Sequence, residues 1–464
     1  MMKLAQTLFT LALLFLSPVI AVEVQGAHFP TASGDQNLPS QTFDSASDYN
    51  GPSDIVIVPL MILCREYRER ERRTQPSPVY NVWGITFETS VDGDTLLQFN
   101  KIDTSKPNCF NDCIPHAFNV TNIDVMFSSS ELLRSVTRIG DRFLSGCSLL
   151  TTFDTSGLTG VQTIGNKFLS GCSSLTTFNA SGLTALTTIG ERFLHECKSL
   201  AAFDTPELKK VSMIPKKFLS GCHALTAFDT SRLKTVKLID QYFLAHCCAL
   251  ITLNTSGLSG VKIIGDDFLI GCSSLTTLDT SGLTGLTTIG KRFLSGCRAL
   301  TSFETNTLMS VTSINHNFLS DCHALTSFNT SGLTALMTID NKFLESCRSL
   351  KTFNASGMRA LTTIGGNFLS DCRSLMAFDT TGLTALTAIG NLFLNSCTSL
   401  TYFNTSDLTA LTSIGNRFMS CCRSLTSFDA SGLTLLPAVG ERFLFNCTSL
   451  TTFIPVDNII TDSS

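Results

Sequence analysis

The chain has 464 residues and a nearly balanced charge, with 33 Lys and Arg against 37 Asp and Glu. This balance favours neither nucleic acid nor an anionic membrane as a partner. We therefore expect no nucleic-acid partner. A chain of this length would ordinarily hold two or three globular domains, but a regular internal repeat takes precedence over that expectation.

The N-terminus has the pattern of a secretory signal peptide. Met1, Met2 and Lys3 precede an apolar run, which is followed by small residues up to Ala21. We therefore expect residues 1–21 to be a signal peptide and the mature protein to be secreted. The sequence holds no run of about twenty apolar residues that could cross a bilayer as a helix, so no transmembrane segment is expected.

Residues 22–132 do not follow the later repeat and are interpreted as an N-terminal extension and cap. Residues 79–87 are strand-like and hold Trp83, which is the only tryptophan of the chain. A large aromatic residue among strand-forming residues suits the core of such a cap.

A 25-residue repeat occupies residues 133–457 and leaves residues 458–464 as a C-terminal tail. Four columns of the repeat hold almost invariant residues, which begin at Ile139, Phe143, Cys147 and Leu150 and recur every 25 positions. Thirteen repeats, here called rungs, result. Their apolar spacing matches neither a helix nor a strand, so each rung must stack on its neighbours and bury a shared interior.

One rung illustrates the expected structure. Residues 175–180 have the Leu-x-x-Leu-x-Leu form of a strand, with Phe178 and Ala180 inward and the residues between them outward. The run from Phe193 to Cys197 predicts one short helical turn on the opposite side. The fold class is therefore predicted as an α/β leucine-rich-repeat solenoid, shaped as a horseshoe or arc, with a non-repeat N-terminal cap.

The run Ile-Gly-x-x-Phe-Leu-x-x-Cys-x-x-Leu-x-x-Phe resembles the BspA-like, Treponema-type class of leucine-rich repeats over residues 133–457. The class usually has Ala before the Phe and Pro after the strand, and this chain departs from it at both positions. The resemblance implies a surface or secreted protein of bacteria or protists that adheres to host matrix or to other cells. It implies no catalytic residue.

Thirteen of the 18 cysteines form one column of the repeat, here called the cysteine ladder. Equivalent residues of stacked rungs lie about 4.8 Å apart, which is within reach of a disulfide. Inward cysteines of such repeats nevertheless pack as small apolar groups, so we expect buried free thiols. In the cap, Cys109, Cys113 and Cys64 supply three thiols for at most one bridge, and Cys109–Cys113 is the candidate disulfide.

No constellation in the sequence indicates catalysis, a metal or a cofactor. His246, Cys247 and Cys248 are adjacent, but no pair of Cys-x-x-Cys motifs has the separation of a zinc finger. The sequence also lacks a Gly-x-Ser-x-Gly motif and a phosphate-binding loop. We therefore interpret the protein as not an enzyme.

The candidate ligand-binding surface is the outward face of the predicted strands. Its candidate residues are Asp154, Asp204, Asp229, Asp279, Glu304, Asp379, Tyr402 and Asp429. The face is flat, polar and poor in aromatic anchors, so each contact should be weak and repetition should supply avidity. The alternative is that Asp, Asn and Thr only solvate the sheet.

A second candidate surface lies on the far side, where the residue before each core Phe is often basic. Its members are Arg142, Lys167, Arg192, Lys217, Arg292, Lys342, Arg417 and Arg442, with Arg298, Arg348, Arg373 and Arg423 just after ladder cysteines. Such a stripe could bind polyanions, but interspersed acidic residues favour an ordinary solvated surface.

Seven sequons mark candidate N-glycosylation sites, at Asn119, Asn179, Asn254, Asn329, Asn354, Asn404 and Asn446. Five of them share the outward strand position. Glycans attached there would crowd the strand face and direct binding elsewhere.

Together these features predict a secreted or cell-surface protein that mediates adhesion or binds a protein or glycan ligand through its strand face. The alternative is an intracellular scaffold for protein–protein interaction, which suits unpaired thiols better than an oxidising compartment does. The last rung has few residues after Phe453 to cover it, so end-to-end self-association is a further expectation.

Overall fold

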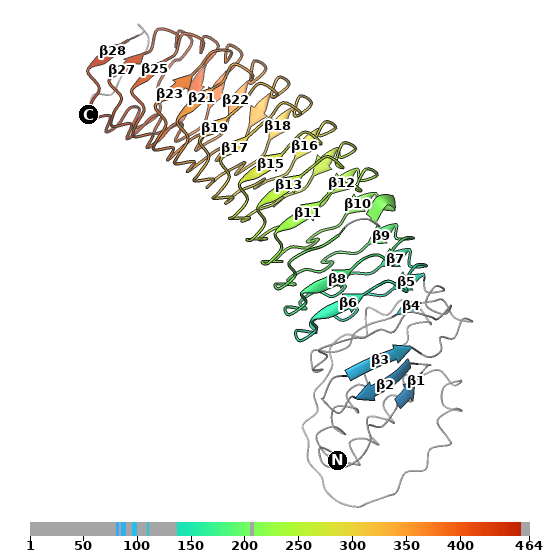
Figure 1. The fold of residues 1–464 in the computed structure, drawn as a ribbon. Helices are drawn as coiled ribbons and strands as arrows, with labels where there is room; N and C mark the ends of the chain where they lie inside the picture. Colours follow the sequence, from blue (N-terminus) through green and yellow to red (C-terminus); the bar gives the residue numbers. More distant parts are fainter. Residues whose placement is uncertain are drawn as a thin grey trace, which may run out of the picture.

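A computed structural model describes residues 137–204 and 208–455, together with the backbone of four short strands before them. The described rungs stack into a curved rod, in which each rung is one turn of the chain (Figure 1). The predicted leucine-rich-repeat solenoid of about thirteen rungs is confirmed.

The first strand column is formed by the predicted Leu-x-x-Leu-x-Leu segments, which pair in parallel with the same segment of the next rung. Its strands are β6 (Thr152–Asp154), β8 (Thr177–Asn179), β11 (Ala227–Asp229), β13 (Thr252–Asn254), β15 (Thr277–Asp279), β17 (Ser302–Phe303), β19 (Ser327–Phe328), β21 (Thr352–Asn354), β23 (Ala377–Asp379), β25 (Tyr402–Asn404), β27 (Ser427–Asp429) and β28 (Thr452–Ile454). Phe178 and Ala180 are buried while Thr177 and Asn179 are exposed, as predicted.

A second strand column, which the sequence reasoning missed, contains the invariant isoleucines. It consists of β5 (Arg138–Ile139), β7 (Thr163–Ile164), β9 (Thr188–Ile189), β10 (Met213–Ile214), β12 (Leu238–Ile239), β14 (Ile263–Ile264), β16 (Thr288–Ile289), β18 (Ser313–Ile314), β20 (Thr338–Ile339), β22 (Thr363–Ile364), β24 (Ala388–Ile389) and β26 (Ser413–Ile414). Two residues per strand are too few to show an alternating pattern. This column follows the outer, convex side of the arc (Figure 1).

Four strands precede the solenoid. β1 (Tyr80–Val82), β2 (Ile85–Thr89) and β3 (Thr95–Phe99) form an antiparallel sheet. β1 and most of β2 fall in the strand-like stretch 79–87, whereas β3 was not predicted. β4 (Cys109–Phe110) pairs in parallel with β5 and so extends the second column. The predicted signal peptide, the side chain of Trp83, the Cys109–Cys113 bridge and the sequon at Asn119 lie outside what the structure describes.

The third side of each rung, residues 190–197 and their equivalents, is here called the turn side, and the predicted helical turn there is wrong. Arg192, Leu194 and Glu196 all have a left-handed backbone, with φ of 60°, 52° and 60°. Their N–H groups point alternately to the next and the previous rung, because Arg192 donates to Lys216, Leu194 to Phe168 and Glu196 to Ser220. A helix would need consecutive right-handed residues. Among the described residues the only helix is the 3₁₀ turn η1 (Leu208–Lys210).

The interior is one continuous apolar column in which rungs repeat the same contacts. Phe193 stacks on Phe218 of the next rung at 5.3 Å between ring centroids, and Phe178 meets Phe193 edge to face at 5.9 Å. Both arrangements are favoured by the aromatic quadrupole. The two phenylalanine columns therefore tie the first strand column to the turn side along nearly the whole rod.

The cysteine ladder is buried up to Cys422, and its cysteines form no disulfides, as predicted. From Cys172 to Cys447 each ladder thiol donates a hydrogen bond to the carbonyl oxygen of the left-handed residue 28 positions earlier, at Sγ–O distances of 3.1–3.3 Å. Burial raises the pKa of the thiols from Cys172 to Cys397, to about 12 for Cys272, so these thiols keep the proton that they donate. The last ladder residue, Cys447, is only half-buried.

A second buried ladder consists of threonines directly after the first strand column. Thr255 is fully buried, and its hydroxyl donates to the carbonyl oxygen of Asp279 in the next rung at 2.7 Å. The same hydroxyl accepts from the N–H of Gly282 at 3.1 Å. A methyl group on Gly282 would overlap the carbonyl group of Thr255, so only glycine fits this corner.

We predict that Gly282→Ala destabilises the fold by about 3 kcal/mol, because the backbone of two rungs must separate to admit the methyl group. Gly260→Ala is the matched control, since the nearest atom there is the flexible Lys237 ammonium. It should change stability by less than about 1 kcal/mol. Urea unfolding followed by circular dichroism measures both, and equal losses would contradict this close-packing account.

Candidate functional site

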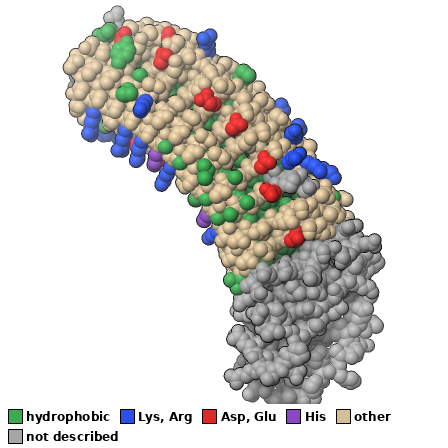
Figure 2. All heavy atoms as spheres, viewed as in Figure 1, with side chains coloured by type: hydrophobic (Ala, Val, Ile, Leu, Met, Phe, Trp, Pro, Cys, Tyr) green, Lys and Arg blue, Asp and Glu red, His purple; other side chains and the backbone are tan. Residues whose placement is uncertain are grey.

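The predicted acidic residues align on one face of the first strand column. We call Asp154, Asp204, Asp229, Asp279, Glu304, Asp379 and Asp429 the carboxylate column. Strand pairing places equivalent side chains in register, for example Asp229 beside Asn254 and Asn254 beside Asp279. All seven are exposed or half-exposed. Acidic side chains follow a line along the face turned toward the reader in Figure 2.

These Asp and Asn side chains also hold the local backbone. In ten rungs the Oδ1 atom at this position accepts a hydrogen bond from the N–H two residues later, as Asp279 does from Ser281 at 2.9 Å. This is an Asx turn, which Asp and Asn form equally well. The turn explains why the column holds Asp or Asn, but it does not explain why particular rungs carry a charge.

The charge is concentrated in two places. Asp204 and Asp229 occupy consecutive rungs, and so do Asp279 and Glu304. Elsewhere an asparagine separates the carboxylates. Asn179 donates to Asp154 and Asn329 donates to Glu304, each at 2.9 Å. Side-chain amides of neighbouring rungs thus supply hydrogen bonds to these two carboxylates.

Tyr402 is the one aromatic side chain that the sequence placed on this face, and it is 51% exposed. It is in register with Ala377 of the previous rung. Met376, which precedes Ala377, is 50% exposed and was missed, because it lies one position before the predicted outward column. Asp379 and Asp429 belong to the strands on either side of Tyr402. The face therefore has a small apolar anchor with acidic neighbours.

The sequon asparagines on this face are fixed by the same turns. Asn254 accepts from the N–H of Ser256 at 2.7 Å, and Asn354 accepts from that of Ser356 at 2.7 Å. Both asparagines are exposed. Asn446 is exposed in the last rung, where it is in the left-handed region.

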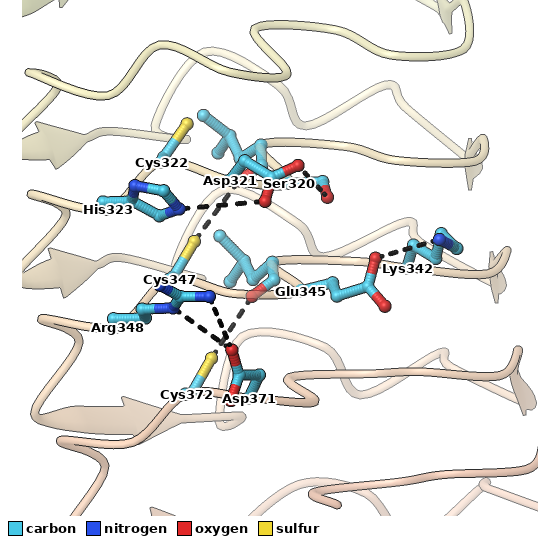
Figure 3. Close-up of polar contacts among 12 residues, drawn as sticks. Ser320, Asp321, Cys322, His323, Lys342, Glu345, Cys347, Arg348, Asp371 and Cys372 are labelled. Carbon is cyan, nitrogen blue, oxygen red and sulfur yellow. Dashed lines mark hydrogen bonds and ion pairs between the residues drawn. The ribbon is translucent and has the colours of Figure 1, made fainter. Parts of the chain in front are cut away.

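Four of the twelve basic residues named above for the turn side, Arg292, Lys342, Arg348 and Arg373, form ion pairs. Arg348 contacts Asp371 at 3.1 Å and Lys342 contacts Glu345 at 3.2 Å (Figure 3). Arg373 contacts the same Asp371 at 2.6 Å. Opposite charges at such short range cancel most of the field that a distant polyanion would sense. The turn side thus offers no uniform basic stripe over these rungs.

Arg292 shows the same neutralisation at a more buried position. Its guanidinium forms a two-point contact with Asp267, which is only 2% exposed. The hydrogen bonds that Arg292 donates to the Asp267 carboxylate raise the pKa of Arg292 above its ordinary value. This contact holds two rungs together on the turn side.

Within residues 137–204 and 208–455, no three His, Cys, Asp or Glu side chains are grouped so that they could hold a metal ion. In the same residues no helix is long and apolar enough to cross a membrane.

Comparisons with known proteins agree with this architecture. A model of the BspA type leucine rich repeat region matches six copies within residues 116–251, 237–376 and 362–463. No curated protein sequence matches the chain.

Two solved structures show similar repeats. A leucine-rich repeat protein from Bacteroides ovatus is 18% identical over 82% of this chain and 89% of its own, with a TM-score of 0.43. A leucine rich cell surface protein from Faecalibacterium prausnitzii is 16% identical over 82% and 96%, with a TM-score of 0.41. On the strength of the repeat model, which covers most of its length, the chain belongs to the BspA-type leucine-rich repeat family.

Proposed function

We propose that this protein is a secreted or cell-surface recognition protein that binds a protein or glycan ligand along the first strand column and so mediates adhesion. The observation that supports this most is the carboxylate column, in which Asx turns hold Asp154, Asp229, Asp279, Asp379 and Asp429 in fixed directions. Fixed side chains lose little conformational entropy when a ligand binds.

The spacing of the charges indicates a cationic ligand. Two pairs of carboxylates occupy consecutive rungs, so their charges recur at about 4.8 Å. An extended basic segment or a chain of amino sugars can place positive groups at comparable intervals. Each contact is weak in water, and several in series give avidity that falls as salt rises above about 0.15 M.

Tyr402 and Met376 supply the apolar part of the proposed contact. Exposed aromatic residues contribute a disproportionate share of binding energy in protein interfaces, and Met adapts to varied partners. Their position at one end of the carboxylate column orients a ligand that carries an apolar group beside its basic residues.

The sequons set a condition on this proposal. Asn254 lies between Asp229 and Asp279, so a glycan on it would cover the densest part of the carboxylate column. Binding through this face requires that Asn254 carry no glycan. End-to-end self-association stays a prediction, because residues 456–464 lie outside the described part of the chain.

We predict that replacing Asp204, Asp229, Asp279 and Glu304 together by Asn weakens binding roughly tenfold or more, because the clustered charge is removed. Stability should change little, since Asn occupies this position natively in five rungs and preserves the turn. Immobilised oligolysine is the minimal probe, and immobilised matrix proteins are the natural candidates. Binding is measured at low and physiological salt.

The matched control reverses four basic residues of the turn side, Arg142, Lys167, Arg192 and Lys217, to Glu. It should leave binding to the strand face intact. Loss of binding in this control, with binding retained in the strand-face variant, would contradict the assignment of the face.

The secreted location is a separate prediction. Expression of the full chain in its native cell, followed by fractionation and mass spectrometry, should find protein that lacks residues 1–21 outside the cell or on its surface. The free thiols of the described residues favour the competing proposal of an intracellular scaffold. Recovery of the chain in the cytosol with Met1 or Met2 retained would support that scaffold instead.

A further inference from the structure

The second strand column departs from its usual composition in three consecutive rungs. Its outward position is Thr, Ser or Ala in the other described strands except the first, which has Arg138. In β10, β12 and β14 the same position holds Met213, Leu238 and Ile263, which are in register with one another. Met213 is 40% and Ile263 is 43% exposed. An apolar stripe therefore stands in a hydroxyl-rich sheet.

Lysines surround this stripe. Lys237 and Lys262 directly precede two of the apolar residues, and the N–H of Lys262 donates to the carbonyl of Lys237 at 2.9 Å. Lys209, Lys210 and Lys234 lie in the turns that lead into the same strands, and all five lysines are exposed. We call these five lysines with Met213, Leu238 and Ile263 the basic–apolar patch.

The local charge is positive although the chain as a whole is negative. Residues 208–267 contain eight Lys and Arg against four acidic residues, Asp229, Asp240, Asp266 and Asp267, whereas the chain has a net charge of −4. Lys234, Lys237 and Lys262 form no ion pair with any other residue that the structure describes. Asp240, the acidic residue next to β12, accepts a hydrogen bond from the N–H of Gln241 at 2.7 Å. The field of the patch is therefore only partly compensated.

The patch lies on the outer side of the arc, where Figure 1 places β10, β12 and β14 and where Figure 2 shows Lys and Arg side chains gathered near the middle of the rod. A flat surface can touch a convex rod only over a few rungs. Three strands span about 10 Å, which is the scale of such a contact. The patch thus has the size and position at which the rod would meet a flat partner.

We propose that the basic–apolar patch docks the protein onto an anionic lipid surface. The lysines would bind headgroup phosphates and carboxylates, while the three apolar side chains enter the interface between headgroups and acyl chains. Peripheral proteins combine these two contributions, since neither alone gives stable attachment. A sulfated glycan would use the lysines but gains nothing from three aliphatic side chains, so the patch favours lipid. This inference concerns the opposite strand column from the proposed ligand face and goes beyond the proposed function.

The test measures binding of the full chain to phosphatidylcholine vesicles that contain about 30 mol% phosphatidylserine, by flotation. Lys234→Gln, Lys237→Gln and Lys262→Gln together should weaken binding about 100-fold, as expected for three lysines at a charged membrane surface. Met213→Thr, Leu238→Thr and Ile263→Thr together restore the residue that neighbouring rungs carry and should also weaken binding. Pure phosphatidylcholine vesicles should bind little.

The matched control replaces three exposed arginines outside the patch, Arg298, Arg417 and Arg423, by Gln. This variant should bind anionic vesicles as the unaltered chain does. Circular dichroism checks that each variant is folded. Absence of vesicle binding by the unaltered chain, or undiminished binding in either patch variant, would overturn the proposal. Binding of immobilised heparin without binding of vesicles would reassign the patch to a polyanionic glycan and overturn it equally.

Discussion

The hydrogen bond between each ladder cysteine and the left-handed residue of the previous rung is the contact on which the rest of the solenoid depends. A left-handed leucine such as Leu294 is costly, because its side chain crowds the backbone. It is retained because its N–H then points to the previous rung, where Phe268 accepts, and its carbonyl points to the next rung, where Cys322 donates. A thiol is a weak hydrogen-bond donor that also packs well among apolar groups, so cysteine both binds the buried carbonyl and fills the apolar interior.

This interior leaves the outer positions free to vary. Asp or Asn is needed to close the turn after the first strand column, and Thr hydroxyls join neighbouring rungs, as Thr276 does by donating to Ile251. Within those limits the choice of Asp over Asn, or of Met213 over Thr, changes the surface without changing the fold. The two proposed binding surfaces are therefore found where the chain departs from its own repeat.

Much of the fold could be predicted from the sequence, because inward residues are almost invariant. The directions of Phe178 and Asn179 and the burial of the cysteine ladder follow from the repeat. The prediction of a helical turn was wrong because residue types do not reveal alternating left-handed backbone conformations. The left-handed residues there include Arg192 and Leu194, which are also common in helices. The second strand column was missed because only Ile marks it.

The candidate site was foreseeable only in part. Its outward direction follows from strand alternation, and the run Asp-Thr-Ser-Gly is a turn signal that could have indicated the Asx turns. The register of Tyr402 against Ala377 and the pairing of Asp267 with Arg292 depend on which residues of neighbouring rungs meet, and the sequence alone does not give this. Ligand chemistry depends on the partner as well as on this chain, so binding stays a proposal.

The most direct measurement of the central claim compares two cysteine replacements in urea unfolding. Cys322→Ala removes the donor to Leu294 inside the rod and leaves a buried carbonyl and a small cavity, which should cost about 2 to 3 kcal/mol. Cys447→Ala removes the equivalent bond at the half-buried last rung and should cost less than about 1 kcal/mol, because water can reach the carbonyl. Equal effects, or no effect at Cys322, would contradict the account.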